Sequence, residues 1–257
     1  MKNTILSEND AKLIEKAIIQ YGRILLSSDL KGIFTEQYTK ESAKNRITQL
    51  AKSGWFRRIK RGLYLIVDSL SARSQNDSSF YIIANALESV SYVSLSHALN
   101  YYQMFDQYDR IITSITTKYS KKYDFDNHTY NFSKIKKNLY FGFVERRENG
   151  KIVRIAEVEK ALLDYLYLES SFAVASLVFE KIKEHHMELD LNKLQTYSEK
   201  FGLTMVRKVG FMLDTLNLNS DLCYKALGKN LGNSRLGSET KVFNAKWRLY
   251  YDDRIIR

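Results

Sequence analysis

In two long stretches of the first 68 residues, the apolar positions recur at helical spacing. Hydrophobic side chains return every three or four positions in residues 8–21 and again in residues 39–52, which predicts two amphipathic helices with one buried face each. Thr39 is placed to cap the second helix with its hydroxyl. Between the two, Ser27 or Ser28 is expected to cap a short helix with the sequence SSDLKGIF.

The second long helix is followed at once by a pattern typical of a β-hairpin. Gly54 suits the left-handed residue just past a helix end. Residues 55–59 and 63–67 are rich in aromatic and β-branched side chains and flank a Lys-Arg-Gly turn at 60–62. This order of elements predicts a winged helix-turn-helix domain over residues 1–68. In that fold the last helix enters the major groove of DNA and the hairpin lies along the phosphates.

The rest of the chain mixes strand-like and helical patterns. Residues 69–79 are polar, and we interpret them as a linker. Strand-like runs, with an Asn149-Gly150 hairpin turn, dominate the first half of residues 80–257, and helical periodicity dominates the second half. The predicted fold class is therefore α+β, with an N-terminal winged helix-turn-helix domain and a larger mixed α/β C-terminal domain.

Positive charge is concentrated where the DNA-binding fold is predicted. The formal net charge is +11, of which residues 1–68 carry +6 and residues 225–257 carry +5, while the middle is neutral. Residues 40–62 alone carry +7. Such a stretch favours a nucleic-acid partner. A solvated basic face on an ordinary helix–hairpin unit is the competing interpretation.

The spacing of polar residues on this helix and hairpin separates two kinds of DNA contact. Asn45 is the best single candidate for base recognition, because its amide can bond adenine in bidentate fashion. The base-contact candidates, which point away from the predicted apolar face, are Lys40, Lys44, Asn45 and Thr48. The phosphate-contact candidates, which supply salt-dependent affinity, are Lys52, Arg57, Arg58, Lys60 and Arg61. A possible second basic surface comprises Arg207, Lys208, Lys241, Lys246 and Arg248.

No spacing of residues along the chain indicates an enzyme. The four histidines lack the spacing of zinc ligands, and His97 is expected to be structural. The glycine-rich run at 227–240 lacks the signature of a P-loop, so we interpret it as a basic loop that can touch phosphate through Lys229 and Arg235. We expect no catalytic residues, no metal and no cofactor. A metal-dependent nuclease is the alternative, using some of Asp109, Glu145, Glu157, Glu159 and Asp164.

Features outside the motifs point to a reducing compartment. The single cysteine, Cys223, allows no disulfide within the chain. No signal peptide and no apolar run of membrane-spanning length is visible. We expect a cytoplasmic protein with no membrane partner.

Four segments, taken in order, carry a resemblance to a known family. They are GWFRRIKRGLYLI (54–66), SLSHALNYY (94–102), RIAEVEKALLDYLY (154–167) and VRKVGFMLDTL (206–216). Together they resemble the AbiEi family, the antitoxin and transcriptional-regulator half of bacterial abortive-infection (type IV) toxin–antitoxin systems. The resemblance implies a repressor that binds inverted repeats in double-stranded DNA of its own promoter. It also implies a C-terminal domain that counteracts a nucleotidyltransferase-like toxin without forming a stable complex, as a defence against phage.

Two further hypotheses remain beside this one. The first is the winged-helix-tethered nuclease, whose cleavage would depend on Asp109 or Glu145. The second is a repressor with no antitoxin role, whose aromatic-rich segment at 80–105 lines a ligand pocket instead of forming core.

Overall fold

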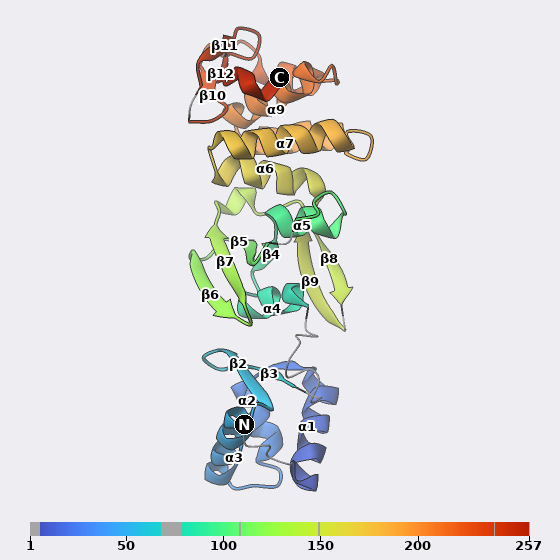
Figure 1. Ribbon diagram of the computed structural model, residues 1–257, viewed down its shortest axis with the longest axis vertical. Coiled ribbons are helices and arrows are strands. Elements are labelled where there is room, and N and C mark those ends of the chain that lie inside the picture. The colour runs from blue at the N-terminus through green and yellow to red at the C-terminus, as the bar shows by residue number, and fades with distance from the viewer. Residues whose placement is uncertain (1–5, 68–78, 108, 149, 239, 257) are drawn as a thin grey trace. The chain divides into compact units, whose positions relative to one another are not determined.

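The computed structural model describes residues 6–67, 79–107, 109–148, 150–238 and 240–256. Within them the chain is a mixed α/β protein with one six-stranded sheet and two three-stranded sheets (Figure 1). It divides into two compact units. The first comprises Met1–Ser89, Tyr123–Thr129 and Arg147–Val153, and the second comprises Val90–Lys122, Tyr130–Arg146 and Arg154–Arg257.

The N-terminal part of the first unit follows the order of elements expected from its periodicity. Its elements are α1 (Glu8–Tyr21), β1 (Ile24–Leu26), α2 (Ser27–Phe34), α3 (Lys40–Lys52), β2 (Phe56–Lys60) and β3 (Leu63–Ile66). The antiparallel sheet has the order β1-β3-β2, with Ile24 opposite Leu65 and Phe56 opposite Ile66. Strand β1 is an addition that the sequence pattern did not predict.

A single hydrophobic cluster fastens the three helices to this sheet. Leu13 and Ala17 of α1 pack with Leu30 of α2, Ile47 of α3 and Phe56 of β2, all buried. These residues come from the apolar stripes that predicted the helices, so the stripes face one shared core.

The helix starts show which local predictions hold. The Thr39 hydroxyl accepts from the Ser42 amide 3.3 Å away, which confirms the cap of α3. The predicted cap of α2 by Ser27 or Ser28 is wrong, because Leu26 occupies the cap position. The carboxylate of Asp29 accepts the Leu26 amide at 3.2 Å, so the acid in the first turn satisfies the helix start instead.

The six-stranded sheet belongs mainly to the second unit. Its strands are β4 (Ser91–Val93), β5 (Ile111–Thr116), β6 (Lys121–Phe125), β7 (His128–Lys134), β8 (Phe143–Glu148) and β9 (Lys151–Ala156). The order is β6-β7-β5-β4-β9-β8, with β4 antiparallel to β5 and parallel to β9. Asn149, half of the predicted Asn-Gly turn, lies outside the described residues.

Helices and a small sheet complete the second unit (Figure 1). The helices are α5 (Leu95–Tyr101), α6 (Val158–Leu168), α7 (Phe172–His185), α8 (Leu191–Phe201), α9 (Leu203–Thr215) and α10 (Asp221–Leu227), with 3₁₀ turns at Lys137–Leu139 and Asp253–Ile256. The small sheet has the order β10 (Ser234–Arg235), β12 (Leu249–Tyr251), β11 (Val242–Asn244). Helix α6 packs against α5, α7, α8 and α9, so it is the centre of the helical layer.

The boundary between the units differs from the predicted one. All but Ser79 of the predicted linker at 69–79 lies outside the described residues, and Ser79 caps α4 (Phe80–Leu87). Helix α4 belongs to the first unit, although it was assigned to the second domain from the sequence. Hydrogen bonds explain the grouping: Lys60 Nζ donates to the Leu87 carbonyl at 2.7 Å, and Asn85 Nδ2 donates to the Ile152 carbonyl at 3.0 Å.

Candidate nucleic-acid interface

One face of α3 carries the predicted base-contact residues. Lys40, Lys44, Asn45 and Thr48 are all exposed. Their spacing of four, five and eight residues from Lys40 places them on one side of a helix. The Thr48 hydroxyl donates to the Lys44 carbonyl at 2.8 Å, so its hydrogen is already used within the helix. The face therefore presents to solvent the ammonium groups of Lys40 and Lys44 and the side-chain amide of Asn45.

The opposite side of α3 is fixed by an ion pair that the sequence analysis did not single out. Arg46 Nε donates to both carboxylate oxygens of Asp10 in α1, at 2.9 and 3.0 Å, and Arg46 Nη2 also pairs with this carboxylate. Asp10 is completely buried. Arg46 is one of the eight basic residues from Lys40 to Gly62, and its ion pair holds α3 against α1.

The same ion pair sets the ionisation of Asp10. Burial alone raises the pKa of Asp10, but hydrogen bonds from Arg46 and Ser7 outweigh burial and leave the pKa below its usual value. Asp10 is therefore charged at neutral pH, and the orientation of α3 rests on a charge-assisted bidentate contact.

The hairpin that follows α3 presents a second basic group. Lys52 at the end of α3 and Arg58 and Arg61 in the hairpin are exposed. Gly62 has φ of +82°, a value that glycine adopts without strain, and it closes the turn. A register shift between Arg58 and Lys60 interrupts the β2–β3 ladder there. The side chains of these three bases therefore face solvent.

The other two predicted phosphate contacts already have partners in the first unit. Arg57 pairs with the carboxylate of Asp126 and lies 5.0 Å from the centre of the Phe125 ring. Lys60 donates to the Leu87 carbonyl and lies 5.9 Å from the Tyr123 ring centre. Of the five predicted phosphate contacts, Lys52, Arg58 and Arg61 are thus the accessible ones.

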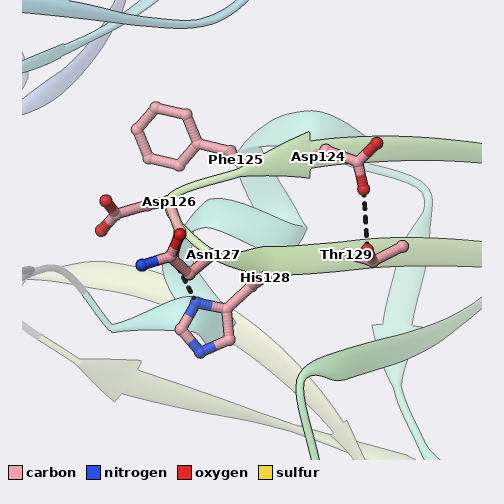
Figure 2. A pocket seen from close by; sticks show the side chains of 6 residues that line it. All are labelled: Asp124, Phe125, Asp126, Asn127, His128 and Thr129. Carbon is pink, nitrogen blue, oxygen red and sulfur yellow. Dashed lines mark hydrogen bonds between the residues drawn. The ribbon is translucent and has the colours of Figure 1, made fainter.

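The turn that holds Asp126 borders an open pocket of about 400 Å³. It is lined by six consecutive residues, Asp124 to Thr129, at the β6–β7 turn (Figure 2). Thr129 Oγ1 donates to Asp124 at 2.7 Å, and His128 Nδ1 lies 2.9 Å from the Asp126 carbonyl. The two acids of the pocket are thus bonded to Thr129 and Arg57, and they do not converge on a common ligand.

The predicted second basic surface is not assembled. Arg207 and Lys208 in α9 are only 3% and 5% exposed, so their assignment to a surface is wrong. Lys246 is exposed but pairs with Asp214, Lys241 is exposed, and Arg248 is half-buried. Lys208 donates to the Leu166 carbonyl at 3.3 Å, and burial lowers its pKa. The aliphatic stems of Arg207 and Lys208 lie among the packed helices, which explains their burial.

The five acids proposed for a nuclease are each bonded to other side chains or to the backbone, and Lys193 Nζ bridges two of them, Glu157 at 3.4 Å and Glu159 at 3.2 Å. Asp109 accepts from Ser96, Glu145 pairs with Arg154, and Asp164 pairs with Lys160. Glu157 accepts from Tyr197 at 2.7 Å, and Glu159 accepts the Asp190 amide at 3.0 Å. Among the residues that the structure describes, no three acids, histidines or cysteines gather as metal ligands.

A buried polar network in the second unit also escaped the sequence analysis. Lys160 and Asp164, one turn apart on α6, pair with each other and are fully buried. Lys160 Nζ donates to the Tyr92 hydroxyl at 2.7 Å, and Asp164 accepts from Tyr92 at 3.1 Å and from Ser94 at 2.8 Å. Burial lowers the pKa of Lys160 and raises that of Asp164, and each partner opposes the shift of the other. The network ties α6 to the strand β4.

Comparisons with known proteins identify the fold without a family. No protein-family model and no curated protein matches the chain. The crystal structure of the RV2827C protein from Mycobacterium tuberculosis is similar, with a TM-score of 0.63 and 12% sequence identity, covering 96% of this chain and 92% of that one. Within the described residues, no helix has the length and apolarity that a membrane span requires. The chain thus shares its fold with the mycobacterial protein over nearly its whole length.

Proposed function

We propose that the protein binds inverted repeats in the promoter of its own operon and represses transcription. The observation that carries the proposal is the exposed face of α3, with Lys40, Lys44 and Asn45, followed directly by the exposed bases of the hairpin. The element order and the β1-β3-β2 sheet support a winged helix-turn-helix, in which such a helix reads the major groove.

The two groups of exposed residues have different tasks in this proposal. Asn45 reads a base edge, since its amide is free of the intrahelical bond that occupies Thr48. Lys52, Arg58 and Arg61 bind phosphates, which positions α3 and makes affinity depend on salt.

The proposal is tested by DNA binding at several salt concentrations. The probe is the DNA upstream of the gene, with a scrambled duplex for comparison. The wild-type protein should prefer the upstream DNA. Replacing Arg58 and Arg61 by alanine should flatten the log–log salt slope by about 1.8, because each lost phosphate contact removes about 0.9.

A matched pair of lysines provides the control. Lys12→Ala with Lys16→Ala removes the same charge from α1, where both side chains are exposed and paired with Glu8 and Glu36. Exposed pairs of this kind add little stability. This control should keep the wild-type slope. Equal slopes for the arginine and lysine variants would show that the hairpin does not bind phosphate.

Asn45→Ala separates base recognition from phosphate binding. It should weaken binding to the upstream DNA by about 1–3 kcal/mol and leave binding to the scrambled duplex unchanged. An equal loss on both duplexes would remove Asn45 from base recognition.

The resemblance to the AbiEi family supports a second task for the protein, which is to counteract a nucleotidyltransferase-like toxin encoded beside it. Expressing the toxin from an independent promoter separates this task from repression. The Arg58→Ala, Arg61→Ala variant should then restore growth as the wild-type protein does. Failure of the wild-type protein to restore growth would leave a repressor without an antitoxin role.

A further inference from the structure

Arg207 in α9 is a buried cation without an anionic partner among the described residues. Its side chain donates to two neutral oxygens, Asn230 Oδ1 at 2.6 Å and Ser234 Oγ at 3.5 Å. Its Nε is buried and has no hydrogen-bond partner. Arginine stays protonated in proteins, so both an unused donor and an uncompensated charge remain at this position.

A second guanidinium lies beside the first. Arg248 Nε donates to the Gly232 carbonyl at 3.3 Å, and Arg207 Nη2 would lie 3.8 Å from a Cβ atom added to Gly232. Both arginines therefore border the same glycine. Burial lowers the pKa of Arg207, and the charge of Arg248 lowers it further. Two like charges are thus held together with no carboxylate paired to either among the described residues.

In the described part of the chain, the Arg207 Nη2 atom donates a hydrogen bond only to an exposed turn, residues 230–232. Asn230 Oδ1 accepts from this atom and also from the Gly232 amide at 3.0 Å. Asn230 and Gly232 are exposed, and Leu231 between them is 76% exposed. A neutral amide oxygen thus occupies the position that a charged acceptor would bind more strongly.

We propose that Arg207, Arg248 and the turn of residues 230–232 bind a phosphate group. A single planar carboxylate is satisfied by one guanidinium fork, whereas a phosphate has enough oxygens to accept from two guanidinium groups at once. A Cβ atom on Gly232 would lie 3.1 Å from Asn230 Oδ1, so the phosphate group takes the place of this amide oxygen beside Arg207. The site lies in the second unit and is independent of the proposed base and phosphate contacts of α3 and the hairpin.

The direct test follows the guanidinium Nε–H signal of Arg207 by NMR in the full-length protein. The signal is assigned by its loss in Arg207→Lys. Titration with inorganic phosphate at constant ionic strength should shift it in a saturable way, and chloride should not. The absence of a saturable shift with phosphate would overturn the proposal.

Arg248→Gln tests the pair without disturbing the buried side chain. This variant should bind inorganic phosphate at least about tenfold more weakly, as expected for the loss of one charge-assisted hydrogen bond. Lys241→Gln removes the same charge from an exposed side chain near the small sheet and should bind as the wild type does. Unchanged affinity in Arg248→Gln would overturn the site even if Arg207→Lys fails to fold.

Two further probes distinguish the source of the phosphate group. Thymidine monophosphate and a scrambled duplex are titrated separately into the Arg58→Ala, Arg61→Ala variant, so that the hairpin contributes less. Saturation by the nucleotide at lower concentration than inorganic phosphate assigns the site to small phosphate esters. Saturation by the duplex but not by the nucleotide assigns it to a nucleic-acid backbone. A shift by either probe that persists in Arg248→Gln would argue against the site.

Discussion

At the scale of single residues, two helical glycines have opposite surroundings. A Cβ atom on Gly210 in α9 would lie 2.1 Å from the ring of Trp247. That ring is fully buried, and its Nε1 donates to Asp214 at 3.2 Å, so it has little freedom to move. A Cβ atom on Gly32 in α2 would meet nothing within 4 Å. The same substitution should therefore have opposite effects at these two positions.

Gly210→Ala is expected to lower the free energy of unfolding of the second unit by about 1–3 kcal/mol, the usual cost of overpacking. Gly32→Ala is expected to raise that of the first unit by about 0.5–1 kcal/mol, because alanine favours the helix. Urea unfolding of both variants measures the difference. A destabilised Gly32→Ala protein together with an unaffected Gly210→Ala protein would contradict the packing described for Trp247.

The burial of individual charged residues could not be predicted from the sequence. In the sequence, Lys160, Arg207 and Lys208 cannot be distinguished from lysines and arginines on the surface. Only the packing of α6 and α9 shows that they are buried. The exposed bases of α3 and the hairpin could be named in advance, because the apolar stripe fixes which side of α3 faces water. Arg57 and Lys60 could not be set apart from Arg58, since their partners are distant in sequence.

At the scale of elements, the Lys160–Asp164 pair positions α6 on the sheet. Removing one charge leaves the other buried and unpaired, which typically costs about 3–5 kcal/mol. We expect Lys160→Met and Asp164→Asn each to destabilise the second unit. The double variant should lose less stability than the sum of the two single losses, because it leaves neither charge buried without its partner. Its asparagine can still accept from Ser94 and Tyr92.

A double-mutant cycle by urea denaturation measures this coupling. Additive losses would mean that Lys160 and Asp164 act separately in spite of their contact. Lys181→Met with Glu184→Gln is the matched control, since that pair lies three residues apart on α7 and the glutamate is exposed. Its coupling should be below about 1 kcal/mol.

The length of an element helps to explain whether its sequence pattern predicted it. The long helices α1 and α3 carry several turns of apolar periodicity, and this periodicity predicts both. Strands β1, β10 and β11 have only two or three residues, too few to show an alternating pattern. Their pairing comes from partners elsewhere in the chain, such as Ile24 opposite Leu65, and single-sequence patterns do not contain that information.

At the scale of the whole molecule, the two units should respond differently to acid. Asp10 belongs to the first unit, and its pKa is lowered because hydrogen bonds from Arg46 and Ser7 outweigh burial. Its contribution to stability is complete above the unfolded carboxyl pKa of about 4 and is lost as pH falls through the lower folded value. Asp10→Asn should therefore weaken the first unit at neutral pH and flatten its loss of stability as the pH falls below about 5.

The two tryptophans report on the units separately. Trp55 lies in the first unit and Trp247 in the second, and the chain has two in all. The indole N–H signals, followed during acidification, should show an altered curve for Trp55 in Asp10→Asn and the wild-type curve for Trp247. Equal changes in both signals would mean that the Asp10–Arg46 pair stabilises more than the first unit.

The reactivity of the single cysteine can report how often the second unit opens locally. Cys223 in α10 is fully buried, its amide donates to Gln195 Oε1 of α8 at 3.1 Å, and burial raises the pKa of its thiol to about 11. A thiol reagent can therefore react only when α10 separates from α8 and lets the sulfur ionise in water. The labelling rate of the unmodified protein then counts these openings directly, with no engineered probe. Its change on adding phosphate would show whether occupation of the Arg207–Arg248 site makes the C-terminal helices open less often.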